Sequence, residues 1–240
     1  MSDRVPAYDA VVLDVDGTLV DTNYQHALAW YRAFRRVGIT LPVWRLHRAI
    51  GMGGDQLVAA VAGDDAEREH GDTLRVAWAE EFQPMLGEVA AFDRVRELLR
   101  AIGEHGPTVV LASSGKPEHV DAYLDLFDGR DLAAAWTTSE DVERTKPEPD
   151  LVAAALDRAG GGDALVVGDT VWDMEAAGRA GQACVAVRTG GFSAAELRDA
   201  GALAVYDSVG DLCEDLDAVL AGSPSVVTSP SGSPVASVSG

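Results

Sequence analysis

The chain has 240 residues with 39 acidic and 19 basic side chains, which gives a formal net charge of -20. Such an acidic balance disfavours nucleic acids and anionic membrane surfaces as partners, because both would repel the protein. No segment resembles a secretory signal or reaches about 18 apolar residues, and the two cysteines lack metal-type spacing. We therefore expect a cytoplasmic protein with reduced thiols.

The first predicted element is a buried strand over the apolar residues 10–13. Two carboxylates, Asp14 and Asp16, follow at its carboxyl end, and side chains two residues apart on a strand face the same way. Close carboxylates repel each other unless a cation or a shared proton lies between them. The alternative is an ordinary turn, since Asp-Gly is a common turn dipeptide.

A helical block follows the first strand, and no segment between residues 21 and 86 predicts a strand. Apolar residues recur there at helical spacing, which predicts helices over residues 23–37, 43–50, 55–62 and 66–82. A glycine-rich link spans residues 51–54. Because the rest of the chain alternates strand and helix, residues 22–86 are predicted to form an inserted all-helical domain.

The remainder of the chain predicts an α/β fold, a doubly wound, Rossmann-like parallel sheet built from residues 1–21 and 87–221. Apolar runs predict further strands at residues 108–112, 134–138, 164–167, 183–187 and 203–206. Helical stretches separate them, and a last helix is predicted over residues 209–220. Residues 222–240 are rich in Ser, Pro, Gly and Val without periodicity, which is typical of a disordered tail.

Polar residues gather at the predicted strand ends, where open parallel sheets bind their ligands. Besides the first acid pair, the strand ends and one loop supply Ser113, Ser114, Lys146, Asp169 and Asp173. Each residue has an ordinary explanation as a helix cap or a surface side chain. Together, four carboxylates near one point favour Mg²⁺, and the lysine and hydroxyl groups suit a phosphate. One carboxylate is left to attack phosphorus, so the pattern predicts phosphoryl transfer.

Four segments resemble the motifs of the haloacid dehalogenase superfamily, in the order of that family. They are Asp14-Val15-Asp16-Gly17-Thr18-Leu19, Ser113 at the end of an apolar strand, Lys146-Pro147-Glu148-Pro149-Asp150, and Gly168-Asp169 with Asp173. The resemblance covers residues 8–220. The helical block resembles the C1-type cap of phosphoglycolate phosphatase and β-phosphoglucomutase relatives.

The resemblance implies a role for each matching position. Asp14 would be the nucleophile that forms an aspartyl-phosphate, and Asp16 would be the general acid and then the base. An aspartate at position 16 favours phosphate over haloacid substrates. Ser113, Ser114 and Lys146 would hold the phosphoryl group. Mg²⁺ would bind at Asp14, at Asp16 through its backbone carbonyl, and at Asp169, with Asp173 close by or acting through water.

The helical block should contain the residues that choose the substrate. The loop with Gly53 is expected to point into the site, and Arg48 to reach a second anionic group; a flexible link with a surface arginine is the alternative. Thr22 and His26 occupy places where β-phosphoglucomutase-like proteins carry similar residues.

We expect a Mg²⁺-dependent phosphatase that acts on a small phosphorylated metabolite, with a sugar phosphomutase as the alternative. A signalling receiver domain uses similar residues, but in a different order and without a helical insertion. A non-catalytic binding protein of the same fold would not need every motif residue. No oligomeric state follows from the sequence.

Overall fold

The core of the protein is one sheet of six parallel strands in the order β3-β2-β1-β4-β5-β6. The computed structural model describes residues 6–224. The strands are β1 (Ala10–Asp14), β2 (Thr108–Ala112), β3 (Ala135–Thr137), β4 (Ala164–Gly168), β5 (Ala183–Val187) and β6 (Val205–Tyr206). This arrangement confirms the predicted Rossmann-like α/β class.

Helices cover both faces of this sheet, because alternate strand residues are apolar on both sides. One face, with Val11 and Leu13 of β1, packs against helices whose bounds are α5 (Val95–His105), α6 (Pro117–Leu126), α11 (Val209–Glu214) and α12 (Leu216–Leu220). The short helix α7 (Gly129–Leu132) follows α6. The other face, with Ala10 and Val12, packs against α8 (Asp150–Ala159), α9 (Val171–Arg179) and α10 (Ala194–Asp199).

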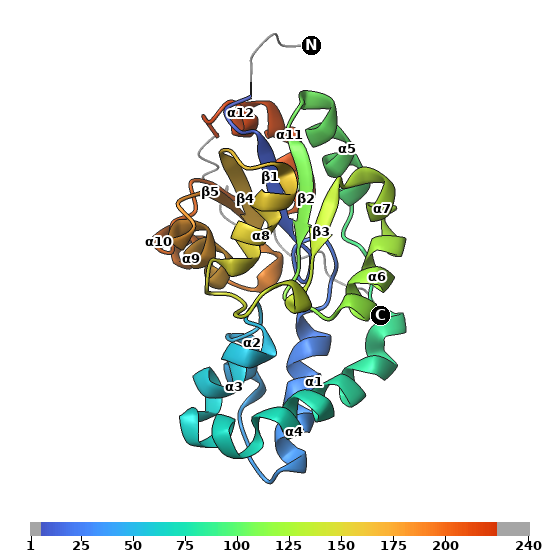
Figure 1. The fold of residues 1–240 in the computed structure, drawn as a ribbon, viewed down its shortest axis with the longest axis vertical. Coiled ribbons are helices and arrows are strands. Elements are labelled where there is room, and N and C mark those ends of the chain that lie inside the picture. Colours follow the sequence, from blue (N-terminus) through green and yellow to red (C-terminus); the bar gives the residue numbers. More distant parts are fainter. Residues whose placement is uncertain (1–5, 225–240) are drawn as a thin grey trace, which may run out of the picture.

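Four helices form a separate group beyond the carboxyl ends of the strands (Figure 1). They are α1 (Asn23–Arg36), α2 (Val43–His47), α3 (Gly54–Ala62) and α4 (Asp64–Phe82), and the 3₁₀ helix Gln83–Glu88 leads back to the core. No strand of the sheet lies between residues 15 and 107, all of which the structure describes. The group supports the proposed division into a core and an inserted helical cap, the name we use below for residues 22–86.

Two predicted helices break or end at other residues in the structure, and one short helix was not predicted. The helix expected over residues 209–220 is two helices that meet at Asp215, whose carboxylate Oδ2 accepts a hydrogen bond from the Tyr206 hydroxyl at 2.7 Å. The second cap helix ends at His47 rather than at residue 50, and α7 carries no apolar pattern that predicts it. Residues 225–240 of the expected disordered tail lie outside the described residues. Within the described part of the chain, no helix is long and apolar enough to span a membrane.

Substitutions of side chains buried in the central strands should destabilise the fold most. Leu111 of β2 is fully buried, so Leu111→Ala should leave a cavity and lower the free energy of unfolding by about 2–5 kcal/mol. Leu126 of α6 is 44% exposed, and Leu126→Ala should change stability by less than about 0.5 kcal/mol. Urea denaturation of both variants measures the difference; equal losses would contradict this assignment of the core.

Candidate active site

Asp14 ends the central strand β1 and is buried at the carboxyl edge of the sheet. Its Oδ1 pairs with the Lys146 ammonium, and its Oδ2 accepts a hydrogen bond from Thr18 Oγ1 at 3.1 Å. Burial raises the pKa of the Asp14 carboxyl well above its usual value; the charge of Lys146 opposes this rise, and those of Asp173 and Asp169 add to it. Asp14 therefore lies in a strongly charged, water-poor position.

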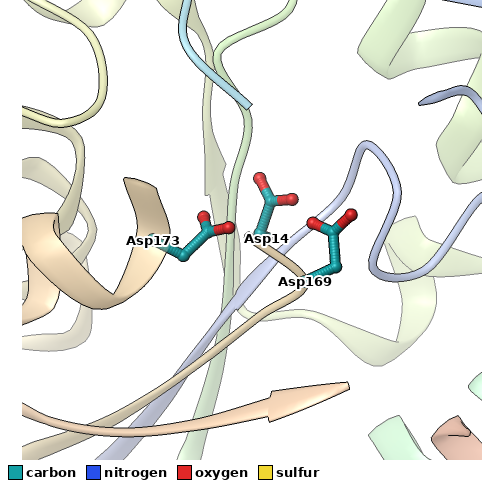
Figure 2. Close-up of side chains that lie close together, drawn as sticks. All are labelled: Asp14, Asp169 and Asp173. Carbon is teal, nitrogen blue, oxygen red and sulfur yellow. The ribbon is translucent and has the colours of Figure 1, made fainter. Parts of the chain in front are cut away.

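Three carboxylates meet at this edge, as Figure 2 shows: Asp14 from β1, Asp169 directly after β4 and Asp173 on α9. Each can place one oxygen within 4.8 Å of the others. Burial, together with the charge of Asp173, raises the pKa of Asp169 to about 7. A divalent cation would relieve this repulsion, and an all-oxygen donor set fits a hard ion such as Mg²⁺.

Asp169 is held by two side chains that sequence reasoning did not select as site residues. Thr18 Oγ1 lies 3.1 Å from Asp169 Oδ1 as well as from Asp14 Oδ2, so its single proton is shared between the two carboxylates, and Asn23 Nδ2 donates to Asp169 Oδ2 at 3.1 Å. Gly17 has a φ of +84°, and a Cβ atom there would collide with the Asp169 carboxylate. The position of Thr18 inside the first motif could have identified it as a site residue. Asn23 begins a cap helix, and nothing in the sequence indicated its contact with Asp169.

Asp16 lies outside this cluster and has its own hydrogen-bond donors. His26 Nε2 is 2.9 Å from its Oδ1, Ser113 Oγ donates to its Oδ2 at 2.7 Å, and Thr22 Oγ1 donates to Oδ1 at 3.4 Å. Burial alone would raise the pKa of Asp16, but the hydrogen bond and charge of His26 and the bond from Ser113 lower it. Two acids two residues apart thus differ in their surroundings: Asp14 lies against Lys146 and two further carboxylates, whereas Asp16 lies against His26 and two hydroxyl groups.

Lys146 is buried between two carboxylates. Besides its pair with Asp14, its ammonium lies 2.7 Å from Asp173 Oδ1. Asp173 Oδ2 accepts hydrogen bonds from the Thr170 backbone N–H at 3.0 Å and from its hydroxyl at 2.5 Å, in a capping box that starts α9. Burial would lower the pKa of Lys146, but the two aspartate charges raise it, so the lysine stays charged. Asp173 therefore fixes the lysine to the helix start.

A cavity of about 250 Å³ opens over Asp14 and Asp16, between the sheet edge and the cap. The hydroxyl of Ser114, another lining residue, is buried without a hydrogen-bond partner among the described residues. Ser113 lies just outside the lining, bound to Asp16. The expected Gly53 lines the cavity on the cap side.

Arg48 does not reach this cavity, contrary to the expected role at a second anionic group. Its guanidinium pairs with Glu196 Oε1 at 2.5 Å and stacks 3.8 Å from the centre of the Phe192 ring. Two cap residues that line the cavity, Arg75 and Trp78, were missed in the sequence. Both lie on α4, where helical periodicity alone does not show which side faces a ligand.

The cap is attached to the core beside Lys146. Asp55 Oδ2 of α3 accepts a hydrogen bond from the Thr145 backbone N–H at 3.1 Å, and Asp55 Oδ1 accepts one from the Thr145 hydroxyl. The Gly53 backbone N–H donates to Thr145 Oγ1 at 3.0 Å. A Cβ atom on Gly53 would collide with this threonine, so glycine permits the close contact. The cap and the core are thus hydrogen-bonded to each other next to the lysine.

Known proteins share this fold and this chain length. A crystal structure of a hydrolase from Pseudomonas syringae matches with a TM-score of 0.82 at 32% identity, covering 88% of this chain and 98% of that one. The protein CbbY (plasmid) of Cupriavidus necator is 29% identical over 225 residues, 86% of this chain and 88% of CbbY. A 5'-nucleotidase of Pseudomonas aeruginosa is 32% identical over 209 residues, 82% of this chain and 90% of that enzyme.

The family model for haloacid dehalogenase-like hydrolases matches residues 8–181. That range contains both acid pairs, the serine at the end of β2 and the buried lysine, so it confirms the resemblance of the motifs. The chain belongs to the haloacid dehalogenase-like hydrolases.

Proposed function

We propose that the protein is a Mg²⁺-dependent phosphatase that hydrolyses a small phosphomonoester through an aspartyl-phosphate on Asp14. The observation that carries this proposal is the pair of acids in one cavity, Asp14 beside Lys146 and Asp16 beside His26. A nucleophile needs a nearby cation to hold the phosphoryl oxygens, and a proton donor needs a separate, positioned carboxyl group. A 5'-nucleotidase among the relatives supports a phosphate ester as the substrate.

In the first step an Asp14 oxygen attacks phosphorus, and the bond from phosphorus to the ester oxygen breaks. Asp16 donates a proton to that oxygen, which leaves as an alcohol, while His26, 2.9 Å away, positions the Asp16 carboxyl group. In the second step Asp16 removes a proton from a water molecule whose oxygen attacks phosphorus. The bond to Asp14 then breaks, inorganic phosphate leaves, and both side chains return to their starting states.

The phosphoryl group needs positive charge and donors where Asp14 faces the cavity. Lys146 supplies the charge, and the unpartnered Ser114 hydroxyl supplies a hydrogen bond. Ser113, by contrast, holds Asp16 in this structure. Asp14, Asp169 and the Asp16 backbone carbonyl would hold Mg²⁺, with Asp173 close by. When bound, the ion supplies positive charge to the phosphoryl oxygens.

A sugar phosphomutase is the second candidate, and one observation favours it. Thr22 and His26, at the places of similar residues in β-phosphoglucomutase-like proteins, both lie within 3.4 Å of Asp16. Such an enzyme would return the phosphoryl group from Asp14 to a bound sugar phosphate. Incubation with hexose 1-phosphates separates the two candidates, because a mutase yields a hexose 6-phosphate and a phosphatase yields free phosphate.

A cytoplasmic location forms part of the proposal. Cys184 and Cys213 are both free, and burial, with the charge of Asp173, raises the pKa of the Cys184 thiol to about 11. Free thiols suit a reducing compartment. The proposed partner there is a small phosphorylated metabolite.

Replacing the nucleophile should abolish turnover without unfolding the chain. Asp14→Asn removes the attacking oxygen anion, so kcat for p-nitrophenyl phosphate should fall by about 10⁴-fold or more. Asp157→Asn on the exposed side of α8 is the matched control and should retain the native rate. Circular dichroism checks both folds; a folded Asp14→Asn variant with native turnover would refute the nucleophile assignment.

Metal removal should silence the enzyme reversibly. EDTA should abolish phosphate release and excess Mg²⁺ should restore it. Asp169→Asn removes a ligand charge, and Asn23→Ala removes a hydrogen bond that orients Asp169, so each should raise the Mg²⁺ concentration for half-maximal activity by about 10-fold or more. Phosphate release measured across a Mg²⁺ titration tests this; activity that survives EDTA would exclude the metal role.

A further inference from the structure

The cap side of the cavity presents an aromatic wall. Trp30 of α1 and Trp78 of α4 both line the cavity, and their rings are stacked with centres 5.6 Å apart and planes 20° apart. The His26 ring continues the stack, 5.5 Å from Trp78. Flat, rigid aromatic surfaces of this kind bind flat apolar faces of a ligand at low entropic cost.

The same wall carries no uncompensated positive charge. Among the described residues of the cap that line the cavity, Arg75 is the one lysine or arginine. Its guanidinium donates to the two Glu67 oxygens at 2.9 and 3.1 Å, to Asp72 at 2.9 Å and to the Gly54 carbonyl at 3.1 Å. These two carboxylates, which lie outside the lining, compensate the guanidinium charge, and Asp55 is a carboxylate within the lining. A second anionic group on the ligand would be repelled here.

The loop at residues 51–54 cannot supply a missing cation. Three of its four residues are glycines, and the fourth is Met52. A Cβ atom on Gly54 would lie 3.2 Å from both Trp30 Cζ2 and Arg75 Cγ, so the loop contacts the indole closely because it has no side chain there. Apart from Arg75 and Lys146, the lining contains one more lysine or arginine among the described residues, Lys116. It belongs to the core loop after β2 and lies two residues after Ser114 in the sequence.

We propose that Trp30 and Trp78 bind an uncharged ring on the leaving alcohol, so that the substrate is the monophosphate ester of a sugar or nucleoside. The inference rests on the proposed function, since it assigns the phosphoryl group to Lys146 and Ser114 and the alcohol to the opposite wall. The cavity admits the ring against the indoles, where its apolar face leaves water. Bisphosphates and phosphorylated carboxylic acids are poor ligands, because their second anion would meet Asp55 and no unpaired lysine or arginine among the cap residues that line the cavity.

Binding to the Asp14→Asn variant tests the inference, because no turnover disturbs the measurement. Isothermal titration is done with glucose 6-phosphate, adenosine 5'-monophosphate, glycerol 3-phosphate, 2-phosphoglycolate and fructose 1,6-bisphosphate. At least one of the two ring monophosphates should bind more tightly than glycerol 3-phosphate, and that one identifies the ring. Fructose 1,6-bisphosphate and 2-phosphoglycolate should bind more weakly than this preferred ring monophosphate.

Substitution of the wall gives the second arm of the test. In the Asp14→Asn background, Trp78→Ala should weaken the preferred ring monophosphate by about 5- to 150-fold, and Trp78→Phe should restore part of the loss. Trp44, which is 68% exposed on α2, is the matched control, and Trp44→Ala should not alter the preference for the ring over glycerol 3-phosphate.

Equal affinities for ring and acyclic monophosphates, or tighter binding of the bisphosphate or of phosphoglycolate, would overturn the inference. These comparisons use the Asp14→Asn variant alone, so they test the inference even if the Trp78→Ala variant fails to fold. Failure of the proposed function has a different signature, since native protein would then release no phosphate from any of the five compounds. Phosphate release without preference for a ring would contradict the aromatic subsite and leave the phosphatase proposal intact.

Discussion

The ion pairs of Lys146 hold the rest of the site together. Three carboxylates within 4.8 Å of one another repel strongly in a buried position, and this ammonium lies against two of them, Asp14 and Asp173. Asp173 is in turn fixed by the capping box that starts α9. Removing the lysine would leave uncompensated buried charge, which is among the most costly changes a folded chain can suffer. The sheet edge, the loop and the helix start are therefore coupled through one nitrogen atom.

The start of α1 links the cap to the carboxylates of the candidate active site through hydrogen bonds. Thr22 and His26 place hydrogen bonds on Asp16, and Asn23 places one on Asp169. These three residues belong to the first turns of the cap, whereas the carboxylates they contact belong to the core. A displacement of α1 would change together the environment of Asp16, the proposed acid–base group, and that of Asp169, the proposed metal ligand. In the proposed mechanism the helical insertion therefore positions reacting groups as well as covering the cavity.

The sequence allowed prediction of those features that local pattern determines. Each of the six strands is a short apolar run, and the carboxyl ends of parallel strands must share an edge, so the meeting of Asp14 with Asp169 could be anticipated. The ion pair of Arg48 could not be anticipated from the sequence, because its partner Glu196 lies 148 residues away. The position of Trp78 in the cavity lining could not be anticipated either, because helical spacing identifies the buried side of a helix but not whether that side faces a ligand. The break at Asp215, whose carboxylate accepts a hydrogen bond from Tyr206, was not predicted either, because periodicity does not reveal such a contact.

The charges of the cavity also bear on the choice between phosphatase and mutase. Positive groups line its core side, at Lys146 and Lys116, whereas the cap side is apolar and acidic. A phosphomutase that passes its phosphoryl group to a sugar phosphate must hold a sugar bisphosphate, and must accept it with either phosphate toward Asp14. One phosphate would then always face the cap side, where Asp55 lies and the Arg75 guanidinium is already paired. A monoester places its single phosphate on the core side and an uncharged ring on the indoles, so this asymmetry favours hydrolysis.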